Sequence, residues 1–84
     1  MDHSVDKAIE ERVIKEASRL IVGSKKATID STLHSLNFDS LNEVELVMGI
    51  EHQFEISIPD DVAAQFKTIK QIVDYLTLHK DVIS

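Results

Sequence analysis

Apolar residues recur at helical spacing near both ends of the chain. The first run lies within residues 5–22 and consists of Val5, Ile9, Val13, Ala17, Leu20 and Ile21. With Ser4 as a cap and Gly23 as a breaker, this spacing predicts a helix from residue 5 to about residue 22. The last run consists of Ile69, Ile72, Val73 and Leu76. It follows a T-x-x-Q capping box at residues 68–71, which predicts a final helix that opens at Thr68 and frays after His79.

The middle of the chain contains a third helical run and two connections. Residues 41–54 keep helical spacing, whereas residues 24–38 have no sustained period and predict a long loop held by Ile29, Leu33 and Leu36. The sequence FEISIP at residues 54–59 alternates like a strand, but it is short, is stopped by Pro59 and has no partner strand, so we expect a packed connection. Residues 60–65 predict a short helical turn. The predicted fold is therefore all-α: one domain over residues 1–84, built as a small bundle of three main helices and one short helix, with a long loop between the first two helices.

The predicted helix at residues 41–54 has two apolar faces. One face gathers Leu46, Val47, Ile50 and Phe54, which we expect in the core. The opposite stripe consists of Leu41, Val44 and Met48 and is bordered by Glu45, Glu51, His52 and Glu55. Two interpretations remain open at this point. Either the long loop covers the stripe, or the stripe is a docking surface whose apolar side chains give contact and whose acids give orientation.

Charge is distributed unevenly along the chain. The formal net charge is −6, and residues 27–66 contain no Lys or Arg but hold Asp30, Asp39, Glu43, Glu45, Glu51, Glu55, Asp60 and Asp61. Such a field repels nucleic-acid phosphates and attracts a basic partner, although a solvated face that only aids solubility gives the same pattern. The chain has no cysteine, its histidines lack metal-ligand spacing, and no apolar run reaches the roughly 18 residues of a membrane span. We therefore expect a soluble, cytoplasmic protein that binds neither nucleic acid nor membrane nor metal.

Ser40 stands at the predicted start of the middle helix, where two roles are open to it. Ser40 and Glu43 form an S-x-x-E capping box, so Ser40 can cap the helix. Asp39 can equally be the cap, and Ser40 then occupies the first helical position with its hydroxyl outward. No His or Lys lies close in sequence to activate that hydroxyl as a nucleophile, and we expect no enzymatic activity from the chain itself.

The residues around Ser40 form a longer pattern. D-S-L at residues 39–41 is followed by x-x-V-E-L-V-x-x-I-E-x-x-F-x-I-x-I-P-D, which ends at Asp60. Further matches are E-E-R-V at residues 10–13, T-I at 68–69 and D-Y-L at 74–76. With this spacing, the chain resembles the acyl carrier protein family over nearly its whole length.

The resemblance implies a cofactor and a set of partners. In that family, a phosphopantetheinyl transferase attaches 4′-phosphopantetheine from coenzyme A to the serine of D-S-L, here Ser40, and the arm's thiol carries acyl groups as thioesters. Asp39 would help the transferase and other partners to find the serine. Basic patches of acyl-handling enzymes would dock on the middle helix, for which we expect Leu41, Val44, Glu45, Met48 and Glu51 to be the contact positions. The expected assembly is a monomer, and its core around Leu46, Ile50, Ile58, Phe66, Ile69 and Ile72 would open to take in an acyl chain.

Two positions before D-S-L depart from the family's usual residues. Asn37 stands where the family usually has Gly, and it can replace Gly if a left-handed backbone is needed there, because Asn tolerates that conformation better than most residues. Phe38 either lines the exit of the arm or plugs the bundle, and we expect the plug. A different class of function also fits the acidic middle helix, namely a helical adaptor that binds a basic partner without any cofactor.

Overall fold

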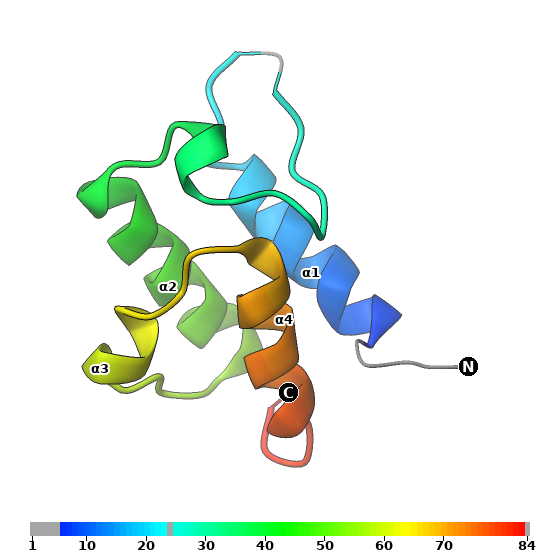
Figure 1. Ribbon diagram of the computed structural model, residues 1–84. Coiled ribbons are helices and arrows are strands. Elements are labelled where there is room, and N and C mark those ends of the chain that lie inside the picture. The colour runs from blue at the N-terminus through cyan, green and yellow to red at the C-terminus, as the bar shows by residue number, and fades with distance from the viewer. Residues whose placement is uncertain (1–5, 24, 84) are drawn as a thin grey trace.

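The computed structural model of this protein describes residues 6–23 and 25–83 (Figure 1). Its elements are α1 (Lys7–Ser18), a 3₁₀ helix η1 (His34–Leu36), α2 (Ser40–Phe54), α3 (Asp60–Ala63) and α4 (Ile69–Leu78). Within these ranges there is no β-strand, and FEISIP forms the predicted connection between α2 and α3. The all-α bundle of three main helices and one short helix is confirmed. No helix in the described ranges is both long and apolar enough to cross a membrane.

Helix α1 is shorter than its apolar spacing predicts. Its N-cap is Asp6, whose carboxylate accepts hydrogen bonds from the N–H groups of Ala8 at 3.0 Å and Ile9 at 3.2 Å. The predicted cap, Ser4, lies outside the described residues. The helix ends at Ser18 rather than near residue 22, yet Leu20 and Ile21 in the following turn still pack against the core. Their spacing therefore reflects burial, which a turn provides as well as a helix does.

The long connection between α1 and α2 is held down by its own apolar side chains. Leu33 and Leu36 are buried and Ile29 is partly buried, as predicted, and η1 adds a single turn that the sequence pattern did not predict. Asn37 has a left-handed backbone, with φ of 64°, which is the conformation in which Asn can replace Gly. Phe38 is only 7% exposed, so the plug interpretation is correct.

Backbone hydrogen bonds tie this connection to the start of α4. The Leu33 N–H donates to the Lys67 carbonyl at 2.9 Å, and the Ile69 N–H donates to the Ser31 carbonyl at 3.0 Å, on either side of an isolated bridge between Thr32 and Thr68. The predicted T-x-x-Q box closes α4 at the same place. The Gln71 N–H donates to the Thr68 hydroxyl at 3.1 Å, and the Gln71 side-chain oxygen accepts from the Thr68 N–H at 3.0 Å.

The core lies where α1, α2 and α4 meet, and Figure 1 shows α3 beside α2 at one edge of the bundle. The six core residues that we expect to surround an acyl chain are all buried, namely Leu46, Ile50, Ile58, Phe66, Ile69 and Ile72. From α2, Phe54 joins them, whereas Val47 is only partly buried. The prediction that Val47 belongs to the core face is therefore only half right, and its position becomes informative at the site described next.

Candidate functional site

Helix α2 begins with a capping box that lies one residue earlier than the S-x-x-E pattern predicts. Asp39 is the N-cap, and its carboxylate accepts from the Asn42 N–H at 2.9 Å. The Asn42 side-chain oxygen accepts in return from the Asp39 N–H at 3.2 Å. The Ser40–Glu43 box is therefore wrong and the alternative with Asp39 as cap is correct. Ser40 occupies the first helical position and is exposed.

The Ser40 hydroxyl lies in the open at a positively polarised helix end. Within the described ranges, its oxygen makes no hydrogen bond. The first N–H groups of any α-helix lack intrahelical acceptors, and here the Asp39 side chain satisfies only that of Asn42. The N–H groups of Ser40 and Leu41 remain for a ligand, and the helix dipole favours a negative charge beside them. An anionic group joined to Ser40 therefore fits this end of the helix.

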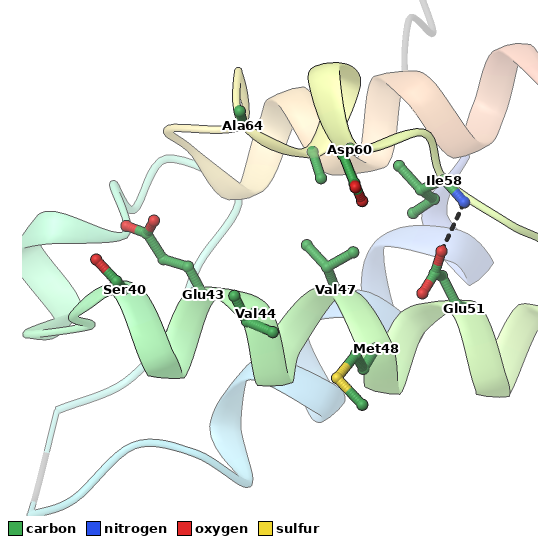
Figure 2. A pocket seen from close by; sticks show the side chains of 10 residues that line it. Ser40, Glu43, Val44, Val47, Met48, Glu51, Ile58, Asp60 and Ala64 are labelled. Atoms are coloured by element: carbon green, nitrogen blue, oxygen red, sulfur yellow. Dashed lines mark hydrogen bonds between the residues drawn. The ribbon is translucent and has the colours of Figure 1, made fainter.

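A groove of about 470 Å³ begins at Ser40 and runs between α2 and α3. In Figure 2, Ser40 and Glu43 lie at one end, Glu51 and Ile58 at the other, and Val47 points between them. This explains why Val47 is only partly buried, since it faces the groove. The lining residues are Ser40, Glu43, Val44, Val47, Met48, Glu51, Ile58, Asp60, Ala63 and Ala64.

The groove brings together some of the predicted site residues and leaves others outside. Ser40, Val44, Met48 and Glu51 line it, whereas Asp39, Leu41 and Glu45 do not. Of its other lining residues, Ile58 was predicted only as part of the core that opens for an acyl chain, and the rest were not predicted as site residues. Val47 could have been predicted to line the groove from its place on the helical wheel, at the border between the core face and the outer stripe. Nothing in the local sequence could have found Ala63 and Ala64, because only the packing of α3 brings them to α2.

The outer stripe of α2 is open to solvent. Leu41, Val44 and Met48 are 64%, 53% and 61% exposed, so the long loop does not cover them. The first of the two interpretations of this stripe is therefore wrong. Glu45 is exposed beside it, whereas Glu51 is only half exposed and already accepts a hydrogen bond from the Ile58 N–H at 2.7 Å.

Acids surround the groove and the stripe without forming a metal site. Residues 27–66 contribute no Lys or Arg, so no cation from that segment shields Glu43, Glu45 or Asp60. In residues 6–23 and 25–83, no cluster of three or more His, Cys, Asp or Glu could hold a metal ion. His34, His52 and His79 are exposed, and His3 lies outside the described residues. The acidic field is therefore available to a basic partner.

Comparisons of the sequence with known proteins identify a family and two relatives. The family described as "Phosphopantetheine attachment site" matches residues 12–76. An acyl carrier protein from Cyanidioschyzon merolae is 50% identical over 54 residues, which span 64% of this chain and 59% of that protein. One from Clostridium perfringens is 41% identical over 66 residues, which span 77% of this chain and 87% of that protein.

A solved structure agrees with the sequence relatives. The crystal structure of a Toxoplasma-specific mitochondrial acyl carrier protein superposes with a TM-score of 0.82 and 26% identity, and the match covers 88% of this chain and 89% of that one. Fold, motif and sequence identity thus lead to the same conclusion. The chain belongs to the acyl carrier protein family, whose prosthetic group is 4′-phosphopantetheine.

Proposed function

We propose that this protein carries acyl intermediates as thioesters on a 4′-phosphopantetheine arm attached to Ser40. The observation that carries the proposal is the exposed Ser40 hydroxyl, which lies in the D-S-L sequence at the first position of α2 and at the mouth of the groove. The chain has no cysteine, so the arm supplies the thiol that holds the acyl group. The proposal covers residues 1–84 as one carrier domain that acts as a cytoplasmic monomer and catalyses no reaction itself.

The residues at the start of α2 fit the phosphodiester of the arm. The N–H groups of Ser40 and Leu41 would be available to a phosphate joined to Ser40 Oγ, and the helix end favours such a charge by ~0.3–1 kcal/mol. The Asp39 carboxylate opposes this charge, but its hydrogen bond to Asn42 holds it in the cap. Asp39 therefore fixes the backbone that presents Ser40, and its second carboxylate oxygen is left for a basic residue of the transferase.

Partner enzymes are proposed to dock on the outer stripe of α2. Leu41, Val44 and Met48 offer apolar contact, and Asp39, Glu45 and Glu51 offer negative charge to basic patches of the transferase and of acyl-handling enzymes. Each exposed ion pair contributes only ~0.2–1 kcal/mol, so docking should be weak, fast and salt-sensitive. A carrier that moves between enzymes needs this property, because tight binding would hold it on one of them.

The groove between α2 and α3 is proposed to receive the acyl chain. Its apolar lining includes Val47, Ile58 and Ala63, and it already exists beside Ser40. Burial of an acyl chain there contributes roughly 0.8 kcal/mol per CH₂ before the cost of ordering the chain. Of the core residues that we expected to separate around an acyl chain, only Ile58 lines this groove. The acyl chain is therefore proposed to lie beside the core rather than in its centre.

Intact mass spectrometry tests the attachment. The protein is incubated with coenzyme A and a phosphopantetheinyl transferase, and we expect the mass of one arm to be added. Ser40→Ala should abolish the gain, and Ser57→Ala, which changes another exposed serine, should preserve it. A wild-type protein that gained nothing would favour the cofactor-free adaptor, and a gain that persisted in Ser40→Ala would show that another residue carries the arm.

A further inference from the structure

Glu51 lies on α2 near the outer stripe and contacts the connection that leads from α2 to α3. Its Oε2 accepts a hydrogen bond from the Ile58 N–H at 2.7 Å, seven residues further along the chain, in a partly buried position (Figure 2). A carboxylate that accepts from a backbone N–H makes a short, charge-assisted bond, roughly twice as strong as a neutral one. Glu51 also lies three residues after Met48, which places it on the same side of α2 as the outer stripe.

The wall of the groove opposite α2 consists of the connection at residues 55–59 and the short helix α3. Helix α3 has only four residues, its N-cap is Pro59 without a side-chain hydrogen bond, and none of its residues is fully buried. Val62 and Ala63 pack only partly against the core. Helix α3 is held from both sides, by the connection at residues 55–59, in which Ile58 is buried and Ile56 packs against the core, and by the buried Phe66 that follows it. The Glu51 bond holds the connection where it enters α3, so loss of this bond should loosen that end of the wall.

We propose that Glu51 is a positioning residue that keeps the groove closed, and that a partner's basic group opens the groove by drawing the Glu51 carboxylate away from Ile58. The two contacts compete, because the same carboxylate lies beside the outer stripe and holds the loop before α3. Docking on α2 and access to the groove are then coupled through one side chain. The identity of the groove's occupant rests on the proposed acyl carrier function, whereas the closing role of Glu51 does not.

Backbone amide exchange measured by NMR on the unmodified chain tests the closing role. In Glu51→Ala, the Ile58 amide and the amides of α3 should exchange about ten-fold faster or more, because a hydrogen bond to a charged group is lost. Glu51→Gln keeps an acceptor oxygen and should give a smaller increase. Glu11→Ala removes an exposed acid of α1, outside the docking surface, and should change neither rate. Unchanged Ile58 exchange in Glu51→Ala would overturn the proposal, as would equal acceleration at the Val73 and Leu76 amides of α4, which would mean general destabilisation.

A second measurement asks whether the same bond protects the cargo. The protein is loaded with an octanoyl arm, and cleavage of the thioester by hydroxylamine is followed by intact mass. We expect faster cleavage in Glu51→Ala than in wild type, and cleavage at the wild-type rate in Glu11→Ala. Equal rates in all three would show that Glu51 does not govern access to the groove. Failure of the loading step would count against the proposed function alone, because the amide-exchange result is obtained without the arm.

Discussion

Arg12 connects α1 to the end of α2, and its replacement should measurably destabilise the fold. Its guanidinium carbon lies 4.0 Å from the centroid of the Phe54 ring, and its Nη2 donates to the Gln53 carbonyl at 3.1 Å. That carbonyl is one of the last four of α2, which have no partner inside the helix. Arg12→Met keeps the apolar stem and a similar helix propensity but removes the guanidinium, and with it these two contacts among others.

The size of the effect follows from these two contacts. A hydrogen bond from a charged group contributes ~1.5–3 kcal/mol, and a cation–π contact ~0.5–1 kcal/mol when partly exposed. Because Arg12 is half-exposed and solvent recovers part of this loss, we expect about 2 kcal/mol in the free energy of unfolding. For a domain of this size, that corresponds to roughly 8–16 °C in Tm.

Urea unfolding followed by circular dichroism gives the comparison. Lys15→Met is the matched control, because Lys15 is an exposed base in the same helix and its loss changes the net charge equally. A double-mutant cycle with Phe54→Leu then separates the ring contact from the carbonyl contact. If Arg12→Met and Lys15→Met differed by less than about 0.5 kcal/mol, the inference that Arg12 secures the end of α2 would be refuted.

Three further predictions concern the cap, the plug and the two chain ends. Asp39→Ala should lower the free energy of unfolding by about 1 kcal/mol in urea titration, because the α2 cap is lost, while Ser40→Ala should leave it unchanged. Phe38→Ala should cost ~3 kcal/mol in the same assay, since it empties a buried ring position; a loss below about 1 kcal/mol would mean that the ring is not a plug. The hydrogen bond between Lys80 and Asp6 lowers the pKa of Asp6 below its ordinary 3.8 and raises the pKa of Lys80 above its ordinary 10.5. The pair therefore stabilises the fold fully between those values, and its contribution declines as pH falls through the lowered Asp6 pKa or rises through the raised Lys80 pKa. In melting curves recorded against pH, Lys80→Met should abolish the alkaline decline due to this pair, whereas the acid decline should persist in part because Asp6 also caps α1.

The sequence pattern was sufficient to predict the helical bundle and its core, because the buried side of a helix requires apolar residues at a regular spacing. Ile69, Ile72 and Leu76 could be predicted to be buried from spacing alone, and the Thr68 cap followed from local chemistry. The start of α2 was harder, since Asp39-x-x-Asn42 and Ser40-x-x-Glu43 are overlapping boxes one residue apart. Local pattern cannot choose between them.

The groove and the role of Glu51 depend on packing between elements. From the sequence, Glu51 is one more acid beside the stripe, and only the placement of the α2–α3 connection brings the Ile58 N–H to its carboxylate. The turn η1 has the same origin, because its geometry depends on burying Leu33 and Leu36 under a loop without periodicity. The identity of Ser40 as attachment residue stays a prediction that the mass experiment decides.

The ion pair between Asp6 and Lys80, at 2.8 Å, brings the beginning of α1 close to the turn that follows α4. In Figure 1, this end of the molecule lies on the opposite side from the start of α2, where Ser40 stands. A circularly permuted chain that joins these two ends by a few flexible residues should therefore keep the fold. A label attached in the turn after α4 would likewise lie on the side away from Ser40 and leave the approach of the transferase clear.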